Sequence, residues 1–208
     1  MIGPDEPRLY VNDIFYSLQG EGVRAGTPNV FVRLSGCNLQ CSGTVVDQAY
    51  QPLCDTEFVS QRPMGYSAIV ARCKQLSPDC RWMILTGGEP TLQVHRGVAD
   101  YFHDAGYLLA IETNGTQNVD HLGLDWICVS PKVAEHALKQ RTAHEVKYVR
   151  AYGQGIPKTQ VEADHYVLSP AWNGDHLDKE TLTWCLQLAR DNPPWRVSMQ
   201  LHKLWAIR

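Results

Sequence analysis

Apolar, β-rich runs alternate along this chain with segments of helical spacing. Nearly uniform apolar strands separated by helices indicate a mainly parallel sheet, because the helices then cover its faces. Three helical segments are too few to complete an eight-stranded barrel, so the expected fold class is α/β: an incomplete parallel (β/α) barrel of about six strands. The predicted strands are residues 30–34, 82–85, 107–112, 126–130, 145–149, 165–168 and 195–201. The predicted helices are residues 67–76, 92–105 and 179–190, the last with Asp178 as N-cap.

Four consecutive predicted strands end in polar or glycine-rich sequences. Cys37 follows the first, Gly-Gly-Glu-Pro at 87–90 the second, Thr-Asn-Gly at 113–115 the third and Ser-Pro-Lys at 130–132 the fourth. Turn chemistry can explain any one of these sequences, but it explains all four together poorly. In parallel α/β folds the chemistry collects at the carboxyl ends of the strands, so these segments are the expected site.

The composition is that of an ordinary globular protein, with 44% hydrophobic and 20% charged residues among 208. This length predicts a single domain over residues 1–208. A net charge of −3 argues against nucleic acid as a partner, because phosphate neutralisation needs a basic face. The sequence has neither a run of 18 apolar residues nor a signal-peptide pattern, so we expect no membrane partner and a cytoplasmic location.

Cysteine usage points to a metal centre. The count of seven is odd, which fits a disulfide framework poorly. Cys37, Cys41 and Cys54 lie in one segment after a predicted strand, and three thiolates can hold three irons of a cubane cluster while the fourth iron stays open for chemistry. The sequence therefore predicts an enzyme. The remaining cysteines lie in apolar or helical stretches and are expected to be small buried hydrophobes: Cys73, Cys80, Cys128 and Cys185.

The pair Cys37-x3-Cys41 after a strand, followed by Thr86 and Gly-Gly-Glu-Pro, resembles the radical S-adenosylmethionine superfamily. Longer motifs resemble one family within it, the 7-carboxy-7-deazaguanine synthases, from about Asp13 to the C-terminus. These motifs are Phe-Tyr-Ser-Leu-Gln-Gly-Glu-Gly at 15–22, Cys-Asp-Thr at 54–56, Ile-Glu-Thr-Asn-Gly at 111–115, Val-Ser-Pro-Lys at 129–132 and Arg-Val-Ser-Met-Gln-Leu-His-Lys at 196–203.

The resemblance implies the conversion of 6-carboxy-5,6,7,8-tetrahydropterin to 7-carboxy-7-deazaguanine with loss of ammonia, on the pathway to queuosine and related deazapurines. It implies a [4Fe-4S] cluster, S-adenosylmethionine and Mg²⁺. An adenosyl radical would remove hydrogen from the pterin carbon that bears the carboxylate, and hydrogen would return so that the cofactor is regenerated. A homodimer and a flavodoxin or ferredoxin as electron donor are also implied.

The resemblance also assigns site residues. The cluster ligands would be Cys37, Cys41 and Cys54, with Thr56 on magnesium. Substrate contacts are expected from Leu18, Gln19, Gly20, Glu21, Arg33, Thr86, Glu112 and His202. Cofactor contacts are expected from Asp55, Gly88, Ser130, Pro131, Lys132 and Ser169.

Two of these assignments keep alternatives. Glu112 could instead cap backbone at a strand end, and a lone histidine such as His202 is usually structural. For His202 we favour substrate contact, because Ser198, Gln200 and His202 would share one polar face of the predicted last strand.

The chain departs from the superfamily spacing at the third cysteine. Residues 42–53 separate Cys41 from Cys54, where two residues are usual, and we expect this insertion to loop out between the ligands. If Cys54 were not a ligand, no viable cluster would remain, but Cys-Asp-Thr at 54–56 matches the family. Smaller departures are Ser169, where the family often has glutamine, and Leu201, where it often has threonine.

Two other functions remain possible on the sequence. One is an activase that installs a glycyl radical on a partner protein, which would need a groove for a peptide. The other is a zinc-binding interaction module, although structural zinc prefers four closed ligands and no histidine lies between Cys37 and Cys54.

Overall fold

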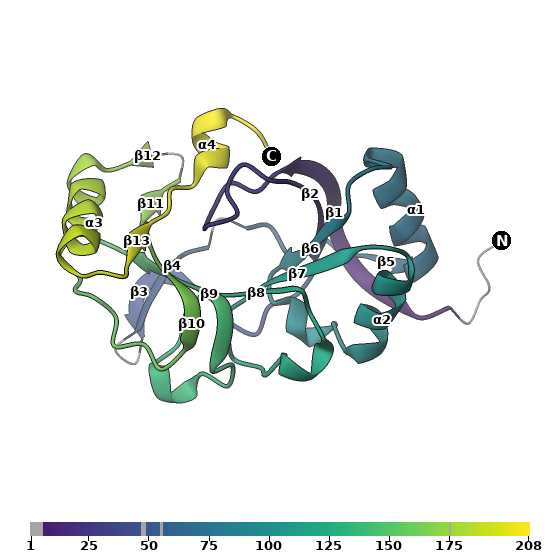
Figure 1. Cartoon of the computed structure of the whole chain (residues 1–208), viewed down its shortest axis with the longest axis horizontal. Helices are drawn as coiled ribbons and strands as arrows, with labels where there is room; N and C mark the ends of the chain where they lie inside the picture. The colour runs from purple at the N-terminus through teal and green to yellow at the C-terminus, as the bar shows by residue number, and fades with distance from the viewer. Residues whose placement is uncertain (1–5, 47–48, 55, 175) are drawn as a thin grey trace.

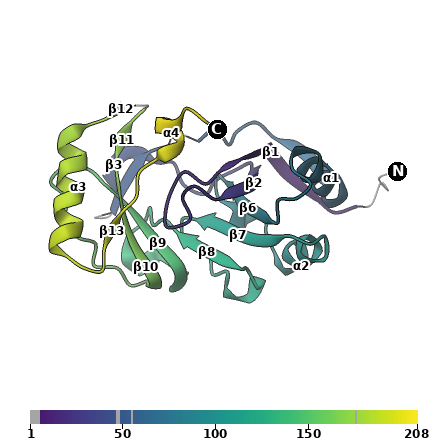
Figure 2. The same ribbon diagram turned by 45° about the horizontal axis from the view of Figure 1, so that its top comes forward.

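The computed structural model describes residues 6–46, 49–54, 56–174 and 176–208. Among these residues, nine strands form one curved sheet: β1 Arg8–Leu18, β2 Pro28–Leu34, β5 Arg62–Gly65, β6 Trp82–Gly87, β7 Leu108–Thr113, β8 Trp126–Val129, β9 Thr142–Arg150, β10 Glu162–Pro170 and β13 Arg196–Val197. Their order is β13-β10-β9-β8-β7-β6-β2-β1-β5. In this sheet β2, β6, β7, β8, β9, β10 and β13 run parallel to their neighbours in the series, whereas β1 pairs antiparallel with both β2 and β5 (Figures 1 and 2).

This arrangement confirms the predicted fold class. In the described part of the chain, the long parallel strands are the six from β2 through β6, β7, β8 and β9 to β10, and β13 adds only two residues. The sheet stays open because its edges, β5 and β13, do not pair with each other. The predicted incomplete barrel of about six strands is therefore present.

The longer helices form two groups, with α1 Tyr66–Leu76 and α2 Arg96–Asp104 on one side of the molecule and α3 Lys179–Asp191 on the other (Figure 1). The first two contact β1, β5 and β7. The third contacts β10 and β13, and Asp178 caps it through the Thr181 N–H at 2.7 Å, as predicted. The remaining helical segments are short: α4 Leu201–Trp205 and the 3₁₀ turns η1 Pro90–Leu92, η2 Asp120–Leu122 and η3 Glu135–Ala137.

Two predicted elements change to another conformation within their expected ranges. The helix expected at 92–105 begins only at Arg96, because Pro90–Leu92 forms a 3₁₀ turn first. The strand expected at 195–201 ends at Val197. Beyond it the Leu201 N–H donates to the Gly20 carbonyl at 2.8 Å and the chain turns into α4, so His202 belongs to a helix and not to the polar face of a strand.

Several strands were missed by the sequence analysis. The longest is β1, in which a register shift between Val11 and Asp13 interrupts the apolar alternation that would have revealed it. Within the expected insertion between Cys41 and Cys54, the described residues form an antiparallel pair, β3 Ser42–Val46 and β4 Ala49–Leu53. A small pair, β11 Trp172–Asn173 and β12 His176–Leu177, lies before α3.

The alternation of side chains along the parallel strands separates the core from the site. In β2, Val30, Val32 and Leu34 are fully buried in the apolar core, whereas Phe31 and Arg33 point to the opposite face and line a cavity. The expected burial of the four remaining cysteines holds for Cys73, Cys128 and Cys185, and Cys80 is partly buried. No helix in the described ranges has both the length and the apolar character needed to cross a membrane.

Candidate functional site

A cavity of about 1000 Å³ opens at the carboxyl ends of the parallel strands. It brings together nearly all the residues that the sequence singled out. Pro131 is buried between two lining residues, and Asp55 lies outside the described residues. The predicted residues that line the cavity are Leu18, Gln19, Gly20, Glu21, Arg33, Cys37, Cys41, Cys54, Thr56, Thr86, Gly88, Glu112, Ser130, Lys132, Ser169 and His202.

The three clustered cysteines share one wall of this cavity as free thiols. Cys37 follows β2, while Cys41 and Cys54 flank the hairpin, where the Cys54 N–H donates to the Cys41 carbonyl at 3.4 Å. Burial raises the pKa of the thiols of Cys37 and Cys41, and the nearby Lys132 ammonium opposes this for Cys41. Three thiols around open space suit a cluster with one free iron. Within the described ranges, no three His, Cys, Asp or Glu side chains converge tightly enough to hold a single metal ion, as a zinc module would require.

The glycine-rich motif after β6 packs directly against the cysteine loop. A Cβ on Gly88 would lie 2.1 Å from the Gly36 carbonyl oxygen, and one on Gly87, whose φ is +135°, would lie 2.0 Å from that of Leu34. The Glu89 N–H also donates to the Gly36 carbonyl at 2.9 Å. Only glycine permits this approach of two backbone segments.

Glu89 joins the ends of β6 and β7, a role that the sequence analysis did not assign. Its side chain is buried, with 1% exposed, and accepts hydrogen bonds from the Thr113 hydroxyl and the Asn114 N–H, both at 2.7 Å. The Asn114 amide in turn donates to Asn38 in the cysteine loop at 3.0 Å. Three of the predicted strand-end motifs are therefore held together by direct hydrogen bonds.

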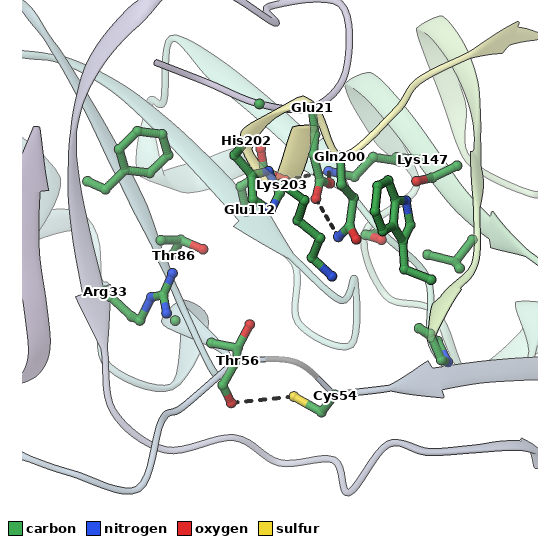
Figure 3. A pocket seen from close by; sticks show the side chains of 18 of the residues that line it. Glu21, Arg33, Cys54, Thr56, Thr86, Glu112, Lys147, Gln200, His202 and Lys203 are labelled. Atoms are coloured by element: carbon green, nitrogen blue, oxygen red, sulfur yellow. Dashed lines mark hydrogen bonds and ion pairs between the residues drawn. The ribbon is translucent and has the colours of Figure 1, made fainter. Parts of the chain in front are cut away.

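A buried charge network lies on the opposite wall (Figure 3). The Lys147 ammonium, on β9, is 2.6 Å from Glu21 and 3.4 Å from Glu112. Gln19 donates to Glu112 at 3.1 Å, and Gln200 donates to Glu21 at 2.9 Å. The sequence analysis missed Lys147 and gave Gln200 no contact of its own.

The network fixes the charges of its members. Burial alone would raise the pKa of Glu21, but Lys147 outweighs it and lowers that pKa to about 2. Burial would likewise lower the pKa of Lys147, yet Glu112 and Glu21 raise it well above its ordinary value. At neutral pH Glu21 is therefore ionised and Lys147 protonated.

Arg33 projects from β2 toward the cavity beside Thr86 (Figure 3). Its guanidinium lies 5.5 Å from the ring of Phe15, which stacks on Phe31 with centroids 4.9 Å apart. The Arg33 Nε is buried, and no hydrogen-bond acceptor for it lies among the residues described. A buried guanidinium N–H without an acceptor fits an anionic ligand at this position.

His202 reaches the cavity from α4 rather than from a strand. A Cβ on Gly20 would lie 2.5 Å from the His202 Nδ1, so glycine at this position lets α4 lie against the segment after β1. The Ser198 hydroxyl, expected on the same polar face, accepts the Gly22 N–H at 2.6 Å instead. The structure therefore brings His202 beside Glu21 by a route different from the predicted one, and the histidine contributes to lowering the pKa of Glu21.

The segment after β8 supplies a second cation, which is partly buried. The Lys132 ammonium donates to the Ser130 hydroxyl at 2.5 Å and to the Ser130 carbonyl at 3.1 Å, and burial lowers the pKa of Lys132. Ser169, at the end of β10, is buried with 3% exposed. Nearby, Trp172 has a buried indole N–H for which the described residues offer no acceptor, and it also lines the cavity.

Comparison with known proteins gives similar chains over nearly the whole length. A family model described as "4Fe-4S single cluster domain" matches residues 18–105. Relatives called 7-carboxy-7-deazaguanine synthase are 38% identical in Bradyrhizobium diazoefficiens, over 95% of this chain and 98% of that protein, and 40% identical in Burkholderia multivorans, over 93% and 96%. The crystal structure of QueE from Escherichia coli has a TM-score of 0.68 at 23% identity, over 94% of this chain and 95% of that one, which shows a shared fold.

The similarity is nearly full length, with identities of 38% and 40% over 95% and 93% of the chain. The chain belongs to the 7-carboxy-7-deazaguanine synthase family.

Proposed function

We propose that this chain is a radical S-adenosylmethionine lyase that converts 6-carboxy-5,6,7,8-tetrahydropterin to 7-carboxy-7-deazaguanine with loss of ammonia. One observation carries the proposal beyond family membership. The same cavity has three free thiols on one wall and the Glu21–Lys147–Glu112 network on the other, so a cluster and a polar heterocycle can face each other across it.

The cysteine wall is the proposed cofactor side. Cys37, Cys41 and Cys54 would hold a [4Fe-4S] cluster, and Gly88 with 130–132 and Ser169 would contact S-adenosylmethionine. When bound, this cofactor pair supplies an organic radical that takes hydrogen from the substrate carbon bearing the carboxylate and later returns one. The close packing of Gly88 on Gly36 keeps side chains out of the space beside the thiols.

The network wall is the proposed pterin side. The pyrimidine edge of a pterin carries N–H donors, and carboxylate oxygens accept hydrogen bonds, so Glu21 and Glu112 suit that edge. Lys147 lies against both side chains, 2.6 Å from Glu21 and 3.4 Å from Glu112, and the Gln19 amide, held at Glu112, adds a group that both donates and accepts. Leu18, Gly20 and His202 complete the proposed contacts around this edge.

The substrate carboxylate is placed at Arg33. The buried Nε of this guanidinium can donate to a carboxylate, and Thr86 lies beside it. Thr56, which lines the cavity, would offer its hydroxyl oxygen to a magnesium ion, which prefers oxygen ligands. The charges within the cavity favour a small anionic substrate over the peptide loop that a glycyl-radical activase would need.

Several further properties belong to the proposal. The chain would act as one radical S-adenosylmethionine domain over residues 1–208, as a homodimer in the cytoplasm, with a flavodoxin or ferredoxin as electron donor. Its product would enter queuosine or related deazapurine biosynthesis. These points follow from the family resemblance.

The decisive experiment is anaerobic turnover of the reconstituted protein with dithionite, S-adenosylmethionine, Mg²⁺ and 6-carboxytetrahydropterin. We expect 7-carboxy-7-deazaguanine, detected by mass spectrometry, without matching consumption of S-adenosylmethionine. The variant Cys54→Ala should lose iron and product, whereas Cys80→Ala, outside the cavity, should keep both. 5′-Deoxyadenosine without deazaguanine would refute the substrate assignment, and neither product from fully iron-loaded protein would refute the reaction class.

A further inference from the structure

The hairpin of residues 42–53 brings two of the predicted cluster ligands side by side. Its register pairs Ser42 with Leu53 and Thr44 with Gln51, so the next pair outward along the same register is Cys41 with Cys54. The Cys54 N–H donates to the Cys41 carbonyl, which continues this pairing to the cysteines themselves. Directly opposed residues in an antiparallel pair lie about 4.5–5.5 Å apart between Cα atoms. The hairpin thus brings Cys41 and Cys54 close together, although twelve residues separate them in the sequence.

The same hairpin is attached to the segment after β8 by one side chain. Gln51, on β4, is only 7% exposed although its neighbours on either side of the hairpin root, such as Leu53, are open to solvent. The Gln51 Nε2 donates to the Lys132 carbonyl oxygen at 2.9 Å. An extended strand advances about 3.3 Å per residue, so this bond lies about 10 Å from Cys54.

We propose that the hairpin is a positioning element for S-adenosylmethionine and that Gln51 is its positioning residue. By holding the Lys132 carbonyl, Gln51 fixes the 130–132 segment relative to the cysteine loop. The distance between these two parts of the proposed cofactor site therefore stays constant. The inference rests on the proposed function in one respect, namely that residues 130–132 contact S-adenosylmethionine.

The chemistry of the contact supports this role over simple surface packing. A glutamine amide that leaves solvent to donate to a single backbone carbonyl orients that peptide, and with it the Lys132 side chain. Ser130 and Lys132 line the same cavity as Cys41 and Cys54, which places this segment beside the cysteines. The hydrogen bond therefore links the hairpin flanked by Cys41 and Cys54 to the segment that would contact S-adenosylmethionine.

The test compares Gln51→Met and Gln51→Glu with the parent protein. Methionine has nearly the length of glutamine but no donor, and glutamate places a carboxylate against the Lys132 carbonyl. Gln75→Met, on the exposed face of α1, is the matched control. Binding of S-adenosylmethionine is measured on the oxidised, iron-loaded protein without pterin or reductant. Hydrogen exchange of the Ser130, Lys132 and Val133 amides is followed in parallel.

We expect iron and sulfide content to stay at the parent level in all variants. Gln51→Met should weaken S-adenosylmethionine binding by about threefold to tenfold, the effect of one lost hydrogen bond. Gln51→Glu should weaken it further, and both should speed exchange at the same amides. In turnover, the KM for S-adenosylmethionine should rise while the KM for the pterin changes less than about twofold.

Two results would overturn the inference. Unchanged affinity and exchange in iron-loaded Gln51→Met would show that the hydrogen bond positions nothing. Loss of iron in proportion to loss of binding would show that the hairpin serves the cluster alone. The binding assay contains no pterin, so a failure of the proposed reaction, seen as absent deazaguanine with normal cofactor binding, would leave the inference standing.

Discussion

Lys147 is the single residue on which most of the network wall depends. Its ammonium contacts Glu21 and Glu112, and its side chain is only 7% exposed. The sequence contained a signal for it that was not used: Glu145 and Lys147 occupy alternate positions of a predicted apolar strand, and so share one face. Two charges on the same face of a buried strand indicate a polar interior.

Replacing Lys147 with methionine should disable the pterin side of the cavity. Removing one member of a buried ion pair leaves the other charge uncompensated, which costs about 3–5 kcal/mol of folding stability. Without the ammonium between them, Glu21 and Glu112 repel each other and lose their positions, so kcat/KM for the pterin should fall by about a hundredfold, which corresponds to about 2.7 kcal/mol. Lys158→Met, on an exposed loop, controls for loss of a lysine. Iron content and S-adenosylmethionine binding should be unchanged. A variant with normal pterin kinetics would show that the carboxylates do not need the ammonium.

The low pKa of Glu21 makes the free energy of unfolding depend on pH in the acidic range. Its pKa is lowered from 4.5 to about 2, so its favourable contribution is complete above pH 4.5 and is lost as pH falls toward 2. The free energy of unfolding of the parent should exceed that of Glu21→Gln by an amount of order 3 kcal/mol between pH 5 and 8, at about 1.4 kcal/mol per pKa unit. Urea denaturation across pH 3–7 measures this difference. A gap that stays constant down to pH 3 would contradict the assigned pKa, and the exposed Glu162→Gln is the control.

At the scale of elements, the contact between the glycine motif after β6 and the cysteine loop is the tightest in the site. Gly88→Ala would place a Cβ 2.1 Å from the Gly36 carbonyl, and such overpacking costs about 1–3 kcal/mol. We expect lower iron loading, weaker S-adenosylmethionine binding by about tenfold, or both. Gly155→Ala has open space around its Cβ and should match the parent in both measurements. Equal behaviour of the two variants would mean that the two segments can separate without loss.

The elements that the sequence predicted well are those with local signals. Apolar runs located the parallel strands, and the motifs at their ends located the cavity. Elements defined by distant pairing were missed. β1 has polar residues at its register shift. The strand predicted at 195–201 is present but ends at Val197, and Leu201 bonds to Gly20 beyond it. His202 was predicted in the site from the alternation of side chains along a strand. That alternation does not predict α4, the helix that carries His202 and packs against the segment after β1.

For the whole molecule, the cysteine loop ties together parts of the chain that are far apart in sequence. Cys37 follows β2, the hairpin root carries the other thiols, and Asn38 connects to the loop after β7. A cluster bound across these segments stabilises the folded state, because the unfolded chain does not present the ligands together.

Removal of the cluster should therefore lower the thermal stability of the whole chain. Binding that reaches a hundredfold excess over its Kd adds about 2.7 kcal/mol, and a chain of this size shifts by about 2–4 °C per kcal/mol. Anaerobic calorimetry should show a Tm at least about 5 °C lower after chelation of the iron. Cys54→Ala should already have the lower Tm and respond little to the chelator. An equal Tm for loaded and stripped parent would argue against a cluster bridging these segments.

The register of the β3–β4 hairpin also bears on how such proteins diverge and how they are found. In an antiparallel hairpin the distance between the two paired residues at its base does not depend on the length of the strands. Residues can therefore be gained or lost in pairs farther along the hairpin while Cys41 and Cys54 stay opposite each other. Length variation should be tolerated at the tip and selected against at the root. A search pattern that demands a fixed interval between the second and third cysteines would reject this chain, whereas one that allows a ribbon between them would retain it.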